Sequence, residues 1–235
     1  MRYYNMGVVV GPRFYVNPSN PLWDDLLAYY TADNTPNDAL GNYNGTLVNG
    51  ATYGTGKINQ GFSFDGVNDY VSVGSRQIFN NTQSFTFSCW INANQIRNRM
   101  LITNANTIND GANLAVWSDG VSRKLALIGG NGSGDSTFGN TTLSTSTWYH
   151  LVAVHTPYDG VNSNVTFYVN GSNDGTGMFD AGTSLSVGNQ YIGTNTTFGG
   201  FFNGIIDEIG IWNRELTPSE VTELYNLGSG KQYPN

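Results

Sequence analysis

The sequence predicts an all-β fold, and three observations support this prediction. Only 11% of the 235 residues are charged, 13% are aromatic, and 30 are glycine. Glycine and asparagine separate short runs of β-branched and aromatic residues, which is the pattern of strands joined by tight turns. No segment before Thr217 has a convincing helical period. A chain of this length is compatible with one large sandwich domain.

The last strand is the clearest element of the chain. In the segment GIIDEIGIW, which ends at Trp212, apolar residues mostly alternate as they do in a half-buried strand. Alternation places Ile205, Ile209 and Ile211 on one face. It places Ile206 and Glu208 on the opposite face.

A short helix is predicted directly after this strand. Thr217, Pro218 and Glu220 form a capping box, in which the threonine and glutamate side chains bind each other's backbone N–H groups. Apolar residues follow at helical spacing, and Gly228 marks the end of the helix. This is the one helix that the pattern favours.

These residues resemble the C-terminal signature of LamG-like, concanavalin A-type jelly-roll domains. Five earlier segments resemble other parts of that family in the expected order: Leu26–Asn34, Asn37–Val73, Ser84–Ala93, Thr147–His155 and Val165–Ser172. The resemblance implies a concanavalin A-like jelly-roll β-sandwich of two antiparallel sheets with a short C-terminal helix. We expect this domain at residues 22–235.

Residues 1–21 form an N-terminal arm, which we expect to be extended. They do not have the pattern of a signal peptide, because the apolar run Gly7–Val10 is too short and Arg13 follows it. The arm carries too much apolar surface for a free tail in water. Two alternatives remain open: the arm packs on its own sandwich as an edge strand, or it binds other protein subunits.

The charge of the chain argues against a nucleic-acid partner. The net charge is −7 and only ten residues are lysine or arginine, whereas binding to a phosphate backbone needs a cationic face. The densest basic positions are Arg97, Arg99, Arg123 and Lys124, interpreted as charges that flank turns. No apolar run is long enough for a membrane span.

Cys89 is the single cysteine of the chain. It shares one strand face with Phe85, Phe87 and Ile91, so we expect a buried and unreactive thiol. No internal disulfide is available, and packing must stabilise the core.

Catalytic residues are not predicted. Related glycosidases place paired carboxylates on one strand face, whereas alternation puts Asp207 and Glu208 on opposite faces. His150 and His155 are five residues apart and also belong to opposite faces, which favours structural or surface roles. We therefore expect a protein without enzymatic activity, with a glycanase as a remote third class.

The family resemblance further implies a structural Ca²⁺ ion held by Asp33 and Asp207. Backbone carbonyls from around Gly56–Gly61 would complete its oxygen ligands. The alternative is that Asp33 caps a turn and Asp207 binds backbone N–H groups at the strand end.

Trp117 and Tyr158 are the aromatic residues expected near loops, and they are the candidate carbohydrate ligands. Trp90, Trp148 and Trp212 are expected to be packed. Two function classes follow: a glycan-binding or adhesion module, and a structural component of a large assembly. Both are compatible with an extracellular or cell-surface assembly or a phage-like virion, as a decoration or fibre protein.

Overall fold

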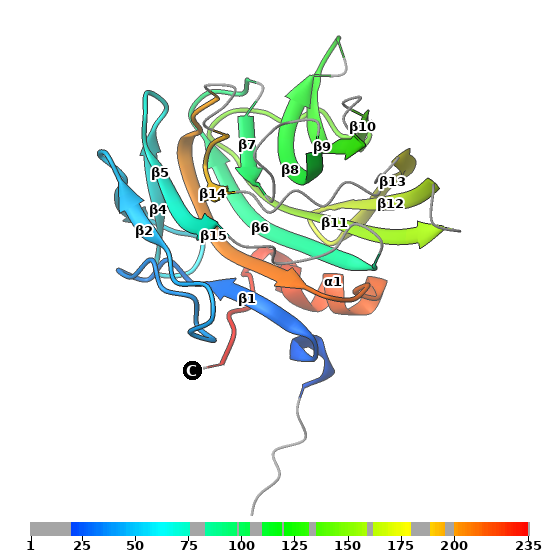
Figure 1. Ribbon diagram of the computed structural model, residues 1–235, viewed down its shortest axis with the longest axis horizontal. Coiled ribbons are helices and arrows are strands. Elements are labelled where there is room, and N and C mark those ends of the chain that lie inside the picture. The colour runs from blue at the N-terminus through cyan, green and yellow to red at the C-terminus, as the bar shows by residue number, and fades with distance from the viewer. Residues whose placement is uncertain are drawn as a thin grey trace, which may run out of the picture.

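The protein is a sandwich of two antiparallel β-sheets, which confirms the predicted fold class (Figure 1). The computed structural model describes residues 20–75, 83–97, 99–103, 110–118, 120–131, 135–158, 162–179, 189–195 and 200–234. Residues 1–19 of the predicted arm lie outside this range. None of the described helices is long and apolar enough to cross a membrane.

One sheet has eight strands in the described part of the chain. Its order is β13 (Ser172–Phe179), β12 (Asn162–Val169), β11 (Trp148–Tyr158), β6 (Phe85–Ala93), β15 (Asn203–Trp212), β4 (Gln60–Asp65) and β3 (Thr52–Thr55), and β1 (Leu26–Tyr30) also pairs with β15. The predicted last strand, β15, therefore lies in the middle of this sheet.

The second sheet has seven strands among the described residues. Its order is β10 (Asp135–Phe138), β9 (Arg123–Asn131), β8 (Asp110–Ser118), β7 (Arg99–Ile102), β14 (Asn189–Ile192), β5 (Tyr70–Ser75) and β2 (Thr46–Val48). β7, β8 and β9 stand next to one another and run alternately up and down.

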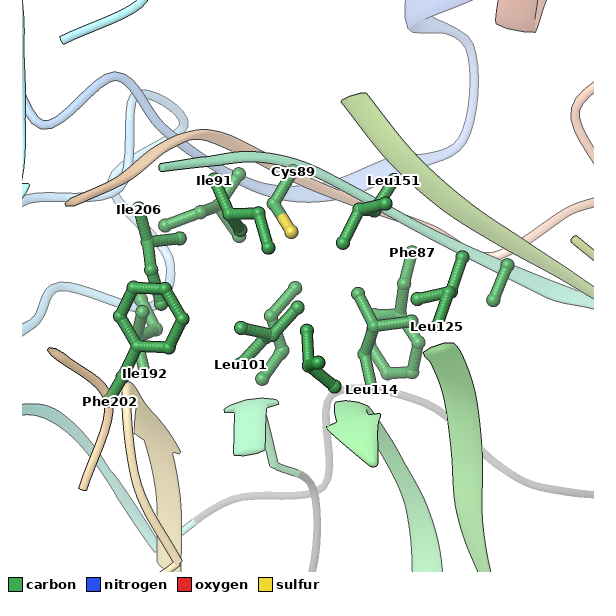
Figure 2. Packing of buried hydrophobic residues seen from close by; sticks show 14 of the residues in the cluster. Phe87, Cys89, Ile91, Leu101, Leu114, Leu125, Leu151, Ile192, Phe202 and Ile206 are labelled. Atoms are coloured by element: carbon green, nitrogen blue, oxygen red, sulfur yellow. The ribbon is translucent and has the colours of Figure 1, made fainter. Parts of the chain in front are cut away.

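The main core lies between the two sheets. Its central side chains come from β6, β7, β8, β9 and β15, as Figure 2 shows. Phe85, Phe87, Cys89 and Ile91 all belong to this core and are fully buried, which confirms the predicted face of β6. Burial raises the pKa of the Cys89 thiol well above its usual range, so the reactive thiolate is disfavoured.

A second apolar cluster covers the outer face of the eight-stranded sheet. Val152 and Val154 of β11 belong to the same cluster as Val221 and Leu224 of helix α1 (Pro218–Tyr225). The predicted capping box is present, because the Thr217 side chain accepts from the Glu220 N–H and the Glu220 side chain accepts from the Thr217 N–H. The helix is thus positioned by its cap and by burial of one face.

The described chain begins and ends on this same outer face. A short 3₁₀ helix, η1 (Pro21–Trp23), is capped by Asn20, and Arg214 donates to the carbonyl oxygens of Pro21 and Leu22. A second 3₁₀ helix, η2 (Asn226–Gly228), follows α1 and leads into the C-terminal tail, residues 229–234. The last two residues of the predicted arm, Asn20 and Pro21, therefore contact the domain.

Candidate functional site

A β-bulge in β15 places two acidic side chains on one face of the eight-stranded sheet. Asp207 pairs with Trp90 of β6, but the next paired residue is Gly210, opposite Ser88. Glu208 occupies the extra position with a φ of 48°. The predicted opposite orientation of Asp207 and Glu208 is therefore wrong, because a bulge adds a residue and shifts the alternation by one.

The same bulge changes which isoleucines face the core. Ile206, Ile209 and Ile211 belong to the core between the sheets, whereas Ile205 is partly exposed. The prediction that Ile205 shares a face with Ile209 and Ile211 is wrong for this reason. Alternation holds on each side of the bulge and fails across it.

Glu208 joins the first strand of the domain to the C-terminal tail. Its Oε2 atom is 2.5 Å from the Tyr29 hydroxyl, and its Oε1 atom accepts from Gln232 Nε2 at 2.9 Å. The Tyr29 hydroxyl is also 3.0 Å from the carbonyl oxygen of Lys231. Glu208 is almost completely buried, so these contacts replace water as its hydrogen-bond partners.

Asp207 and Asp33 hold the turn between β3 and β4. The Asp207 Oδ2 atom accepts from the backbone N–H groups of Lys57 and Ile58, at 2.7 and 3.0 Å. The Asp33 Oδ1 atom accepts from the N–H of Gln60 at 3.0 Å. Both predicted aspartates therefore lie at the predicted turn, and both bind backbone N–H groups there.

Gln232 connects the two acidic positions. Its amide nitrogen donates to Asp33 Oδ2 at 2.7 Å and to Glu208 Oε1 at 2.9 Å. Asp33, Asp207 and Glu208, together with Tyr29 and Gln232, form what we call the acidic cluster. The Gln232 amide is uncharged, so it does not neutralise the carboxylates, but it gives one oxygen of each carboxylate a hydrogen-bond donor.

Burial controls the protonation of this cluster. Burial and the negative charge of Asp207 raise the pKa of Glu208 to about 9. Burial also raises the pKa of Asp207 to about 7, although three backbone N–H groups favour its ionised form. A neutral Glu208 is the expected state at pH 7, because removal from water penalises the charged form.

The groups around Asp33 and Asp207 can be compared with those that a Ca²⁺ ion needs. The carboxylate oxygens are of the type that Ca²⁺ prefers, but the turn at 57–60 directs N–H groups, and not carbonyl oxygens, at the two aspartates. Among the described residues, no three His, Cys, Asp or Glu side chains form a group suited to a metal ion. As arranged, the residues fit the capping role, and calcium stays a prediction.

Among the described residues, the two histidines and the Asp207–Glu208 pair are buried and form no accessible catalytic site. His150 and Ser88 are 2.9 Å apart beneath α1, and His155 contacts Phe85 in the core. Burial lowers the pKa of His150 to about 3 and that of His155 to about 4. Asp207 and Glu208 share a face but are likewise buried, so a polysaccharide has no access to them.

The outer face of the seven-stranded sheet carries the predicted ligand residue Trp117. Trp117 pairs with Lys124 across β8 and β9, and Ala115 pairs with Ala126. Neighbouring Leu114 and Val116 belong to the core, so these pairs face outward. The half-buried rings of Trp117 and Phe138 pack on Ala115, Ala126 and Ile128 in one apolar cluster, which we call the Trp117 platform.

A second group of aromatic residues lies on this outer face. Tyr70 and Tyr191 meet edge to face with ring centres 5.3 Å apart, and the Phe201 ring centre is 6.4 Å from that of Tyr70. All three are only partly buried. The sequence does not indicate this group, because the proximity of Tyr70 and Tyr191 depends on the pairing of β5 with β14.

Tyr158 does not join Trp117 on this face. It is the last residue of β11 and therefore belongs to the eight-stranded sheet. The position of its side chain lies outside the described part of the structure. Trp90 and Trp212 are buried as predicted, whereas Trp148 is half-buried.

Comparisons with known proteins were consistent with this architecture. Residues 65–222 match the family described as the concanavalin A-like lectin/glucanases superfamily. No curated protein sequence matches the chain.

A domain of an extracellular enzyme has a similar fold. Domain 4 of AbnA, a GH43 extracellular arabinanase from Geobacillus stearothermophilus, was solved in complex with arabinotriose. It aligns with a TM-score of 0.67 and 22% identity, covering 85% of this chain and 97% of that one.

Two toxin domains show the same similarity over part of their length. The binding domain of Paraclostridial Mosquitocidal Protein 1 aligns with a TM-score of 0.66 and 18% identity over 87% of this chain. The binding domain of Botulinum neurotoxin DC, in complex with rat synaptotagmin II, aligns with a TM-score of 0.65 and 16% identity over 87% of this chain. The chain spans about half, 52%, of each toxin domain, and at these identities the similarity shows the fold.

Proposed function

Because the chain belongs to the concanavalin A-like lectin/glucanases superfamily, we propose that it is a non-catalytic glycan-binding module. The proposed binding surface is the outer face of the seven-stranded sheet, with Trp117 as its central residue. The observation that carries the proposal is the half-buried indole of Trp117 on an apolar platform.

The platform has the properties of a surface that stacks on sugar rings. An aromatic ring buries a large apolar area while its own orientation is fixed by its neighbours. Ala115 and Ala126 are fully buried in this cluster, and Trp117 and Phe138 are its half-buried aromatic members. Trp residues held in this way contribute strongly to binding because little conformational freedom is lost.

The second aromatic group favours an extended ligand. Tyr70 on β5 and Trp117 on β8 are separated by two intervening strands, or about 14 Å at the usual spacing of 4.7–4.9 Å. A chain of several linked sugars can contact both positions, whereas a single sugar cannot. We therefore expect oligosaccharides to bind more tightly than monosaccharides.

The absence of catalysis is part of the proposal. The acidic side chains that share a face, Asp207 and Glu208, lie on the other sheet and are buried beneath the C-terminal tail. Two of the similar structures described above are toxin binding domains, and the third, Domain 4 of AbnA, was solved in complex with arabinotriose. These similarities support a binding role, although fold does not determine function.

A glycan array with purified protein tests the proposal, followed by titration of the best ligand. Trp117→Ala is expected to weaken binding at least about tenfold, as expected when a central tryptophan is removed. Trp148→Ala is the matched control, because it makes the same change in the other sheet and should leave affinity unchanged. Equal melting temperatures establish that both variants are folded. Unchanged binding by Trp117→Ala would place the site elsewhere.

A role in a larger assembly is the second candidate function. It rests on the predicted arm and includes the phage-like virion or cell-surface context. Asn20 and Pro21 are held against the domain, but residues 1–19 lie outside the described structure. The glycan-binding and assembly roles are compatible, since a protein displayed on a surface can also bind sugars.

A further inference from the structure

Asparagine followed by glycine is the dipeptide in which an asparagine side chain most readily reacts with its own backbone. The chain contains five such pairs, and the structure describes both residues of four of them: Asn44–Gly45, Asn49–Gly50, Asn170–Gly171 and Asn203–Gly204. Glycine has no Cβ atom, so its backbone nitrogen can approach the preceding side chain without a steric barrier. The contacts of each pair therefore determine how fast it reacts in the folded protein.

The reaction joins the glycine nitrogen to the Cγ atom of the asparagine. The side-chain nitrogen leaves as ammonia and takes up the proton of the glycine N–H, and a cyclic succinimide remains. Water then opens the ring. Attack at the Cγ carbonyl gives aspartate, whereas attack at the main-chain carbonyl gives isoaspartate. In isoaspartate the backbone runs through the side chain and is longer by a methylene group.

Two of the four pairs are held at the eight-stranded sheet. The Asn203 side chain donates to the carbonyl oxygen of Asp65 at 2.8 Å and accepts from the Asn94 amide at 3.0 Å. The Asn170 side chain accepts from the backbone N–H of His150 at 2.9 Å. Each asparagine must lose these hydrogen bonds before its Cγ atom can reach the next nitrogen, and this loss costs free energy.

The pair Asn49–Gly50 is held through both residues. The Asn49 side chain donates to the carbonyl oxygen of Asn68 at 2.5 Å, and the Gly50 N–H donates to the Asp69 carboxylate at 2.8 Å. A hydrogen bond to a charged group is stronger than one between neutral groups. The attacking nitrogen is therefore restrained as well as the side chain.

Asn44 differs from the other three asparagines. It is exposed, and its side chain makes no hydrogen bond in the described part of the structure. The Gly45 N–H alone is held in this pair, by the carbonyl oxygen of Pro36 at 2.9 Å. The Asn44 side chain can therefore rotate towards the Gly45 nitrogen without losing a hydrogen bond of its own.

The backbone on both sides of Asn44 is fixed. The carbonyl oxygen of Tyr43 accepts from the Tyr30 hydroxyl at 2.6 Å. On the other side, Thr46 is the first residue of β2 and pairs with Ser72 of β5. A methylene group added to the backbone between these two anchors has to shift β2 relative to β5, because the pairing register depends on the length of the connection.

Gly45 leaves no room for such a shift. A Cβ atom on Gly45 would lie 2.6 Å from Val71 Cγ1 and 2.7 Å from the carbonyl oxygen of Pro36, so its backbone is closely packed. β2 has only three residues and ends the described seven-stranded sheet. A short terminal strand opens more easily than the strands of the core.

We propose that Asn44 deamidates faster than the other three asparagines in the folded protein, and that its isoaspartate product releases β2 from the sheet. The aspartate product keeps the normal backbone and leaves β2 paired. Release of β2 exposes the edge of β5, and an unpaired edge is a template for association with another chain. Neither step involves the Trp117 platform, so this inference is independent of the proposed function.

Incubation of the full chain in mildly alkaline buffer, followed by peptide mapping, tests the site. Asn44 should convert severalfold faster than Asn49, Asn170 or Asn203, because fewer hydrogen bonds have to break. In urea, where these hydrogen bonds are lost, the four rates should become similar. Equal rates in the native protein, or the same order of rates in urea, would overturn the assignment.

Hydrogen exchange tests the release of β2. The isoaspartate form, separated by chromatography, should exchange the amides of residues 46–48 faster than unreacted protein, with β6 unchanged. Freshly purified Asn44→Asp has the same added charge on a normal backbone and should exchange like wild type. Unchanged exchange at residues 46–48 in the isoaspartate form would refute the release.

Two glutamine variants complete the test. Asn44→Gln should keep β2 protected through the incubation, because a glutamine would have to form a larger and less favourable ring. Asn37→Gln is the matched control, since Asn37 is exposed in the same loop but is not followed by glycine. It should change during incubation as wild type does. Loss of β2 protection in Asn44→Gln at the wild-type rate would show that another site is responsible.

Discussion

Replacing Glu208 by glutamine should stabilise the protein. The Tyr29 hydroxyl has one proton but lies within hydrogen-bond distance of both Glu208 Oε2 and the Lys231 carbonyl oxygen. Both contacts are satisfied when Glu208 is protonated and donates to Tyr29, which then donates to Lys231. The amide of Glu208→Gln can donate in the same way and carries no charge.

The magnitude follows from the pKa of Glu208, which rises from 4.5 to about 9 on folding. At pH 7 the folded protein binds a proton here that the unfolded chain does not. Each unit of pH above 4.5 then lowers the free energy of unfolding by about 1.4 kcal/mol, which gives an upper limit of about 3.4 kcal/mol at pH 7. Wild-type stability should fall further as the pH rises to 9, and the variant should lack this contribution.

Urea unfolding of both proteins between pH 7 and 9, in EDTA, measures the effect. The two buried histidines are the same in both proteins and are mainly neutral above pH 7 in the unfolded chain, so their contribution cancels in the comparison. Glu215→Gln makes the same chemical change at an exposed position and should alter stability by less than about 0.5 kcal/mol. A Glu208→Gln protein less stable than wild type at pH 7, or a difference independent of pH, would refute the reasoning.

Four further expectations can be measured independently. If Ca²⁺ binds Asp33 and Asp207, EDTA should lower the melting temperature by an amount that Ca²⁺ restores and Asp207→Ala abolishes, whereas a melt that ignores chelator identifies both aspartates as capping groups. A thiol-reactive dye should label Cys89 only in denaturant, and Cys89→Ser should cost about 1–3 kcal/mol of stability. Rapid labelling of native protein would contradict its burial. Deleting residues 1–19 should leave the melting temperature unchanged and abolish any oligomer seen by sedimentation, if the arm is an assembly element; a strongly destabilised monomer would show that it belongs to the fold. Incubation with laminarin, agar, alginate and chitin fragments should yield no products, and turnover lost on mutating one carboxylate would reveal an enzyme.

The fold could be predicted because its signals are local. The face of β6 that carries Cys89 follows from alternation along one strand, and the capping box of Thr217 and Glu220 lies within four residues. Both patterns depend on backbone geometry that neighbouring residues determine. These are the elements for which sequence and structure agree in detail.

The bulge in β15 could not be predicted in the same way. Glu208 adopts a left-handed backbone conformation, at φ 48°, which glycine or asparagine would have indicated and glutamate does not. A regular strand would place Asp207 and Glu208 on opposite faces. A sequence pattern that assumes a regular strand therefore cannot predict the contacts of Glu208 with Tyr29 and Gln232. The one extra residue of the bulge therefore determines which side chains form the acidic cluster.

Strand register concealed the remaining features of the candidate site. Trp117 and Phe138 are 21 positions apart in the sequence, and only the pairing of β8, β9 and β10 brings them into one apolar cluster. Tyr70 and Tyr191 are likewise neighbours because β5 pairs with β14. Contacts between distant strands depend on long-range pairing, which the composition of each strand does not encode.

The described chain enters and leaves the domain at almost the same place. Asn20 and Lys231 both bind the Glu223 carboxylate of α1, on the side of the sandwich opposite the Trp117 platform. A tether, tag or neighbouring domain attached near Asn20 or near Lys231 would therefore hold the molecule on the side opposite the Trp117 platform. The platform would point outward in both cases, so immobilisation through either terminus should give the same orientation on a sensor and the same access for a soluble polymer.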